Sequence, residues 1–288
     1  MVSEPGTHSN VKGLVALITG GGTGIGLMIT KALARNGAAK LYIAARRIEP
    51  LKTAASSIGE HVIPIQCDVT DKEDLKRAVK TVKDDAGYLN LLVCNSGTTG
   101  PGIDMAGKQD SLEEFSARHM GFAMDDYIHP FMVNVVGVWY TAMAFLPLLD
   151  AGNKAGNVSQ TSQVIVMASI AGLVKAGGAG WAYGQSKAAS IHASKQLATL
   201  LPRWNMRANC IAPGFFPSDL ASPGMEKWKQ PDGTYKNIPK RLIPIGRPGH
   251  DEEIGGTVLY LASKAGAYTN GSVLVVDGGT LSGFPSVL

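Results

Sequence analysis

The chain of 288 residues is 45% hydrophobic and 17% charged, so it carries enough apolar material to bury a sizeable core in one domain or two small ones. Its formal net charge of +4 is small, and its basic residues form no dense block beyond the pair Arg46 and Arg47. These features argue against nucleic acid as a partner and favour a phosphorylated small molecule.

The cysteines and the N-terminus bear on the cellular compartment. Cys67, Cys94 and Cys210 are an odd number with no CxxC spacing, which predicts buried thiols in a reducing compartment. The first ten residues have neither the basic start nor the apolar run of a signal peptide. We therefore expect a cytoplasmic protein. The six histidines form no HExxH cluster, so no metal site is expected.

Short β-branched runs alternate with helix-patterned segments along the whole chain. The first runs are LVALITG, LYIAAR, HVIPIQCDV and LLVCNSG, with a helix expected over residues 25–36. QVIVMAS, RANCIAPG and SVLVVDGG follow, with a helix expected over residues 251–263. This alternation predicts an α/β fold with a doubly wound parallel sheet, covered by helices on both faces as three layers. No linker-like shift in composition divides the chain, so we expect one domain over residues 1–288.

Two regions lack strand or helix patterning, residues 98–130 and 217–248. Loops of this length in a compact domain usually serve as lids or binding loops. In doubly wound folds such loops emerge at the carboxyl ends of the strands, where ligands bind.

Residues 131–149 carry no charge and are nearly long enough to span a bilayer. Asn134, Pro147 and the absence of basic flanks argue against a membrane segment. We expect a helix buried between the core and a partner subunit.

The stretch TGGGTGIG, residues 19–26, lies between the first strand and a helix. Glycines there let the chain turn sharply and let a pyrophosphate approach backbone N–H groups at the positive end of the helix. The spacing is GxxxGxG, which differs from the GxGxxG pattern of many dinucleotide sites. A merely flexible turn is the alternative. The candidate phosphate contacts are Gly20, Thr23, Gly24, Ile25 and Gly26.

Within WAYGQSKAA, Tyr183 and Lys187 are four residues apart in a segment of good helix formers, which places them one turn apart on one face. An adjacent ammonium stabilises a phenolate and would lower the pKa of Tyr183 from its usual value. Such a tyrosine can act as a general acid or base. The alternative is a half-buried tyrosine beside a solvated lysine.

Together, TGGGTGIG and YGQSK resemble the short-chain dehydrogenase/reductase family in its form with one Rossmann-like domain. The resemblance implies four catalytic positions. Ser169 would hydrogen-bond the substrate oxygen, Tyr183 would exchange a proton with it, and Lys187 would lower the pKa of Tyr183 and hold the nicotinamide ribose. Asn134 would anchor a water that connects Lys187 to solvent.

The same resemblance implies the cofactor contacts. Ala44 stands where NAD-dependent members carry an acidic residue, and Arg46 with Arg47 follows, so NADP(H) is expected because a guanidinium can bind its 2′-phosphate. Further contacts are implied to adenine from Asp68 and Val69, to the ribose from Asn95 and Gly97, and to the nicotinamide from Pro213, Gly214 and Ser218.

The intact Ser, Tyr and Lys set argues for reduction of a carbonyl by hydride transfer, on a substrate of the 3-oxoacyl or fungal polyketide type. An apolar substrate pocket is expected from Met105, Phe115, Met120, Phe122, Tyr127, Phe215, Phe216, Met225 and Trp228. Ordinary packing of a lid is the alternative for these residues. A redox-silent NADP(H)-binding protein and a non-redox enzyme are the alternative functions. The family resemblance also implies a homodimer or homotetramer.

Overall fold

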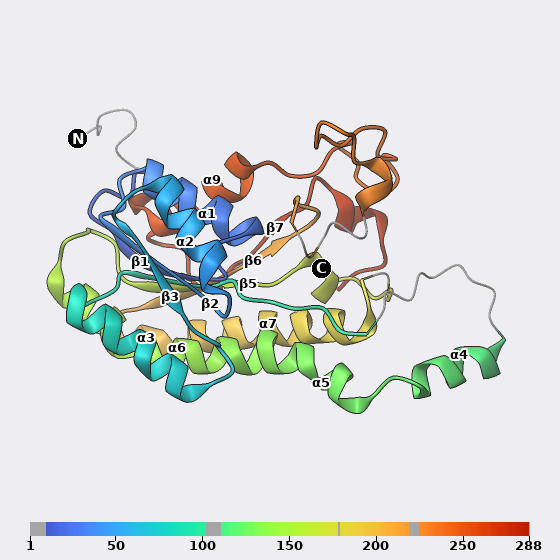
Figure 1. Ribbon diagram of the computed structural model, residues 1–288, viewed down its shortest axis with the longest axis horizontal. Helices are drawn as coiled ribbons and strands as arrows, with labels where there is room; N and C mark the ends of the chain where they lie inside the picture. The colour runs from blue at the N-terminus through green and yellow to red at the C-terminus, as the bar shows by residue number, and fades with distance from the viewer. Residues whose placement is uncertain (1–9, 102–110, 178, 219, 221–224, 288) are drawn as a thin grey trace.

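A seven-stranded parallel sheet forms the centre of the molecule, in the order β3-β2-β1-β4-β5-β6-β7 (Figure 1). The computed structural model describes residues 10–101, 111–177, 179–218, 220 and 225–287. The strand order reverses between β1 and β4, and ligands of doubly wound folds bind at this switch point. The strands are β1 (Val15–Thr19), β2 (Lys40–Ala45), β3 (Val62–Gln66), β4 (Leu91–Cys94), β5 (Gln163–Met167), β6 (Arg207–Pro213) and β7 (Val273–Val276).

Helices cover both faces of the sheet, which confirms the predicted three-layer α/β/α fold (Figure 1). One face carries α1 (Gly24–Arg35), α2 (Ile48–Ile58) and α9 (Asp251–Ala262). The opposite face carries α3 (Lys72–Asp85), α6 (Val138–Ala155) and α7 (Trp181–Leu200). Short 3-10 helices are η2 (Ile170–Gly172), η3 (Leu201–Trp204), η4 (Glu226–Trp228), η5 (Lys264–Gly266) and η6 (Thr280–Gly283).

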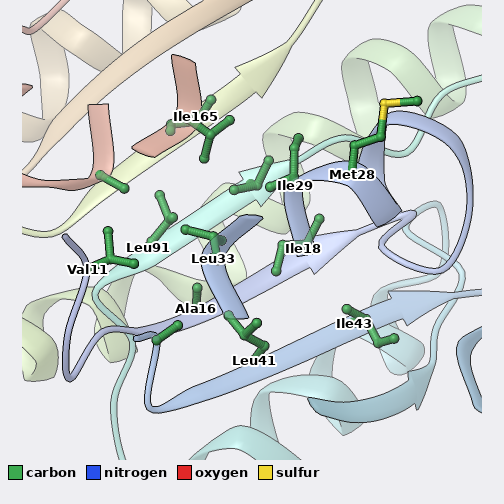
Figure 2. Close-up of a cluster of buried hydrophobic side chains, with 14 of the residues drawn as sticks. Val11, Ala16, Ile18, Met28, Ile29, Leu33, Leu41, Ile43, Leu91 and Ile165 are labelled. Carbon is green, nitrogen blue, oxygen red and sulfur yellow. The ribbon is translucent and has the colours of Figure 1, made fainter. Parts of the chain in front are cut away.

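Two hydrophobic cores lie on the two faces of the sheet because successive strand side chains point in opposite directions. On one side, Ile18 of β1 and Leu91 of β4 pack against Ile29 and Leu33 of α1 (Figure 2). Alternate strand residues such as Leu17 face the other core, beneath α3, α6 and α7. Several strands are therefore apolar throughout, as the sequence predicted.

The region predicted to be irregular before residue 131 contains two helices, so that part of the expectation was wrong. They are α4 (Leu112–Met120) and α5 (Met124–Phe131). Ser111 and Glu114 form a capping box that starts α4. No residue of α4 is buried, and the helix lies at the end of an arm that extends away from the sheet (Figure 1). Leu112, Phe115 and Met120 of α4 are exposed, so this helix has no side that faces the core.

The predicted apolar helix over 131–149 is observed as two segments, the π-helix η1 (Met132–Gly137) and α6. The continuous run Met124–Ala155 is long and apolar enough to cross a membrane by length and composition. However, Val138, Phe145 and Leu149 of α6 are buried in the core beneath the sheet. α6 therefore packs as a core helix. Such a helix can be long and apolar enough to pass the length and composition test for a membrane span.

We predict that Gly152→Ala destabilises the fold. A Cβ at residue 152 of α6 would overlap the carbonyl oxygen of Leu89, which is backbone and cannot easily move. We expect the free energy of unfolding to fall by about 1–3 kcal/mol, measured by urea denaturation followed by circular dichroism. Gly256→Ala in α9 is the control, because a Cβ there meets nothing within 4 Å and should stabilise the helix by about 0.5–1 kcal/mol. Equal stability of G152A and wild type would contradict this close packing.

Candidate active site

The glycine loop makes a tight turn directly after β1. Gly20 and Gly24 have φ of 66° and 49°, a region that favours glycine. The amide of Gly20 donates to the carbonyl of Ala44 at 2.7 Å, which ties the loop to β2. A Cβ on Gly26 would overlap the carbonyl of Gly20, so only glycine allows α1 to begin this close to the turn.

The beginning of α1 fits a phosphate. Thr23 is the N-cap but makes no side-chain capping hydrogen bond, and the first turn of α1 has no acidic residue. Backbone N–H groups and the positive end of the helix dipole therefore face the loop without a carboxylate to compete. A Cβ on Gly24 would lie 2.9 Å from Cβ of Ser218, so the loop that follows β6 reaches the glycine loop. Ile25 is partly buried beside it.

Asn95, which was expected to contact the ribose, holds the glycine loop through hydrogen bonds. Its Nδ2 donates to the carbonyls of Thr19 at 2.9 Å and Gly20 at 3.4 Å. The amides of Asn95 and Ser96 both donate to the Thr19 hydroxyl, at 2.9 and 3.0 Å. The sequence reasoning missed Thr19, although it is the first residue of the glycine motif. These bonds lock β1 to β4 at the point where the strand order reverses.

A basic and acidic pair lies at the ends of β2 and β3. Arg46 and Arg47 are exposed, and Arg47 is the N-cap of α2. Partial burial opposes ionisation of Asp68, but hydrogen bonds from Thr70 and the charge of Arg46 outweigh it and lower the pKa of Asp68. Val69 packs closely on Gly137 of η1, where a Cβ would lie 2.9 Å from Val69 Cγ2. Arg46 is thus close enough to Asp68 for its positive charge to lower the pKa of the Asp68 carboxyl.

Lys187 is buried at the carboxyl end of β5. Lys187 is only 4% exposed, and its Nζ donates to the carbonyl of Met167 at 2.9 Å. Burial lowers the pKa of Lys187 to about 8. A Cβ on Gly97 would lie 3.4 Å from Lys187 Nζ and 3.3 Å from Asn134 Oδ1, so three predicted site residues converge here.

Asn134 joins the segment after β4 to α7 from within the π-helix η1. Its side chain donates to the carbonyl of Thr98 and the hydroxyl of Ser186, both at 2.9 Å, and accepts from the Thr98 amide at 3.0 Å. Its backbone carbonyl accepts from Ser190 at 2.7 Å. Ser186 and Ser190 were missed by the sequence reasoning, and their four-residue spacing was the signal, because it places both hydroxyls on one face of α7.

Tyr183 lies at the beginning of α7, half-buried, with Lys187 Nζ 5.8 Å from its ring centroid. Burial raises the pKa of Tyr183, while a hydrogen bond with the side chain of Ser169 acts in the opposite direction. The expected lowering of the Tyr183 pKa by Lys187 is therefore not observed. The physical reason is that the Lys187 ammonium donates to the Met167 carbonyl and is itself buried away from solvent.

Ser169 follows β5 in extended conformation and caps the short helix η2, accepting from the Ala171 amide at 3.1 Å. Because this bond uses an oxygen lone pair, the Ser169 hydroxyl proton stays available as a donor. Ser169 and Tyr183 thus form a pair, with Lys187 one helical turn beyond.

The end of β6 approaches the turn after β7. Pro213 is the last residue of β6, and the Gly214 amide donates to the Val276 carbonyl at 2.9 Å. A Cβ on Gly214 would lie 2.7 Å from Cβ of Asp277, so glycine is needed at this close approach. Gly214 then leads to Ser218 beside the glycine loop.

The residues expected to wall an apolar pocket do not form one surface. Phe216 is buried in the main core, and Met225 anchors a separate cluster with Phe215 and Trp228. Met120 on α4 is 82% exposed. The remaining members are partly exposed, namely Phe115, Phe122 and Tyr127, the last bonded to Gln185 at 2.9 Å, while Met105 lies outside the described residues.

The cysteines are buried free thiols, and burial raises the pKa of Cys67 to about 11 and those of Cys94 and Cys210 to about 12. In the described part of the chain, no group of three or more His, Cys, Asp or Glu side chains could hold a metal.

Comparison with known proteins identifies the family. The family model described as enoyl-(acyl carrier protein) reductase matches residues 20–280. The short-chain dehydrogenase/reductase PhomF of Diaporthe leptostromiformis is 43% identical over 279 residues, covering 96% of this chain and 94% of that one. The rhamnolipids biosynthesis 3-oxoacyl-[acyl-carrier-protein] reductase of Pseudomonas aeruginosa is 30% identical and covers 94% and 98%.

A solved structure titled Pseudomonas aeruginosa RhlG/NADP active-site complex superposes with a TM-score of 0.77 at 28% identity, covering 96% of this chain and 99% of that chain. The chain belongs to the short-chain dehydrogenase/reductase family, a family of nicotinamide-dependent oxidoreductases. The family predicted from the sequence, including its fungal members, is confirmed.

We predict that Lys187→Met changes stability in a pH-dependent way. The folded-state pKa of Lys187 is lowered to about 8 from 10.5, so the unfolded chain holds this proton more tightly, and wild type gains stability as pH rises through that window. The variant lacks this gain. Relative to wild type, it should therefore lose as much as about 3 kcal/mol between pH 8 and 10.5. Urea denaturation at several pH values measures this.

Lys195→Met removes an exposed ammonium from the same helix and controls for the loss of one charge. A difference between K187M and wild type that does not change with pH would contradict a buried ammonium at residue 187.

Proposed function

We propose that the protein is an NADP(H)-dependent reductase that converts a ketone to an alcohol by hydride transfer. The observation that carries the proposal is the placement of Ser169, Tyr183 and the buried Lys187 together, at the carboxyl ends of the central strands. This is the edge where ligands of doubly wound sheets bind.

The cofactor, when bound, supplies the hydride. The chain supplies the proton and the position of the substrate oxygen. Ser169 would donate a hydrogen bond to that oxygen, and Tyr183 would donate its phenol proton to it as negative charge develops. Because burial raises the pKa of Tyr183, the phenol stays protonated at neutral pH, the form needed for reduction. Lys187, whose ammonium donates to the Met167 carbonyl beside Tyr183, would hold the nicotinamide ribose.

The preference for NADP(H) rests on charge at the end of β2. Ala44 brings no carboxylate to this position, and the guanidinium groups of Arg46 and Arg47 are exposed beside it. A 2′-phosphate accepts charge-assisted hydrogen bonds from such groups. The RhlG structure, which is titled as an NADP complex, supports this choice.

The substrate we propose is an apolar carbonyl compound of the 3-oxoacyl or polyketide type. The relative named as a 3-oxoacyl-[acyl-carrier-protein] reductase supports this class. Phe215 and Trp228, which are only partly buried, follow the proposed nicotinamide-contact segment in the chain and would add apolar surface for such a substrate. We also propose a homodimer or homotetramer, because Met132, Tyr140 and Trp181 are exposed on the helical face. For the location we propose the cytoplasm, which the free thiols support. Light scattering that reports a monomer at micromolar concentration would overturn the oligomer.

We predict that the protein oxidises NADPH with a member of a panel of ketones and 3-oxoacyl thioesters, measured by absorbance. Enoyl thioesters belong in the panel because the matched family model is described by that activity. Tyr183→Phe should lower kcat by about 10²–10⁴-fold while leaving NADPH binding intact, since only the proton donor is lost. Tyr260→Phe on α9, which removes an exposed hydroxyl paired with Thr269, is the matched control.

Tight NADPH binding with no oxidation across the panel would instead support a redox-silent protein or a non-redox enzyme. Turnover in Y183F equal to wild type would overturn the proposed proton donor.

We predict that Arg46→Ala weakens NADPH binding about tenfold to a hundredfold, because a charge-assisted hydrogen bond to the 2′-phosphate is lost. NADH binding should not change. Arg203→Ala removes an exposed charge from η3, after α7, and is the control. Isothermal titration calorimetry with both cofactors measures these affinities. Equal losses for NADPH and NADH would rule out a role of Arg46 in reading the 2′-phosphate.

A further inference from the structure

The segment after β7 begins inside the matched family model and continues past its end at residue 280. It begins with a turn around Asp277, whose carboxylate accepts from the amides of Gly279 at 2.9 Å and Leu281 at 2.6 Å. The Asp277 carbonyl also accepts from the Thr280 hydroxyl at 2.7 Å. These bonds start η6 and direct the chain back towards the loop after β5.

The C-terminal segment then runs beside the loop that carries Ser169. The Lys175 amide donates to the Pro285 carbonyl at 2.8 Å, and the Val287 amide donates to the Leu173 carbonyl at 3.0 Å. Val174 and Ser286 form an antiparallel bridge between these bonds. The tail therefore adds a short strand pairing to residues 173–175.

Side chains reinforce this pairing. Leu281 is 7% exposed and belongs to a cluster with Ala168, Ile170 and Leu173, the residues on both sides of Ser169. Burying this leucine removes apolar surface from water and so stabilises the contact between the tail and the loop.

The same loop also lies directly against α7. A Cβ on Gly172 would lie 2.6 Å from the Lys187 carbonyl carbon and the Ala188 amide nitrogen. The loop thus contacts both the tail and the helix that carries Tyr183 and Lys187.

We propose that residues 281–287 are a positioning element for the active site, which holds the loop 169–175 against α7 so that Ser169 meets Tyr183. The tail acts through its backbone hydrogen bonds to residues 173–175. The kinetic part of this inference rests on the proposed reductase function.

The test uses Val287→Pro, which removes the N–H that donates to Leu173, and a chain lacking residues 284–288. Val287→Ala is the matched control, because the Val287 side chain is 63% exposed and alanine keeps the N–H. We expect V287P and the truncated chain to lower kcat by about tenfold to a hundredfold, with the affinity for NADPH unchanged. V287A should match wild type.

A pH profile distinguishes positioning from general loss of structure. The Ser169 hydrogen bond lowers the pKa of Tyr183, so its loss raises that pKa. In the alcohol-oxidation direction the phenolate is the base, and the rate rises with pH through this pKa. In V287P the rising limb should therefore move to higher pH. An unchanged kcat and an unchanged limb in both altered chains would overturn the proposal.

Hydrogen exchange tests the clamp without any substrate. The amides of Gly172, Leu173 and Val174 bond to carbonyls within their own loop, at 3.1, 2.8 and 3.0 Å. They should exchange faster in the truncated chain only if the tail holds the loop, while α7 keeps its protection. Unchanged exchange at these amides would overturn the inference, even if wild type reduced nothing in the panel. That second result would count against the proposed function alone.

Discussion

The burial of one positive charge, the ammonium of Lys187, constrains the architecture of the site. An ammonium removed from water is costly unless hydrogen-bonded, and here the Met167 carbonyl at the end of β5 accepts from it. A Cβ on Gly97 would come within 3.3 Å of Asn134 Oδ1 and 3.4 Å of Lys187 Nζ, so Gly97 packs closely on both side chains. The charge is therefore held by the end of a strand, the segment after β4 and α7 together.

Uncharged polar side chains, bonded largely to the backbone, position the carboxyl edge of the sheet. Asn95 and Thr19 lock the ends of β1 and β4 together, and the π-helix η1 presents the amide of Asn134 to both Thr98 and Ser186. Such insertions in helices frequently occur at functional sites. The carboxyl edge of the sheet is thereby rigid where a nucleotide binds in folds of this class.

The sequence predicted features whose signal is local. The glycine loop and the Tyr183–Lys187 pair depend on a few neighbouring residues, and the strands depend on their apolar runs. These features could therefore be predicted from the sequence. The pKa of Tyr183 could not, because it depends on burial and on Ser169, which is distant in sequence. Helix α4 escaped prediction since it buries no face. The hydrogen bond from Asn95 to the Thr19 carbonyl and the pairing of the tail with residues 173–175 join segments that are distant in sequence, so only the folded chain shows them.

The central claim is that the site transfers hydride to a carbonyl carbon while Tyr183 supplies the proton. The most direct measurement uses NADPH carrying deuterium at C4 of the nicotinamide, in each of its two stereochemical forms, with a ketone that the protein reduces. The account predicts that one form delivers its deuterium to the carbinol carbon of the product and the other delivers none, as a fixed ring orientation requires. Product without deuterium from either form would contradict hydride transfer at this site.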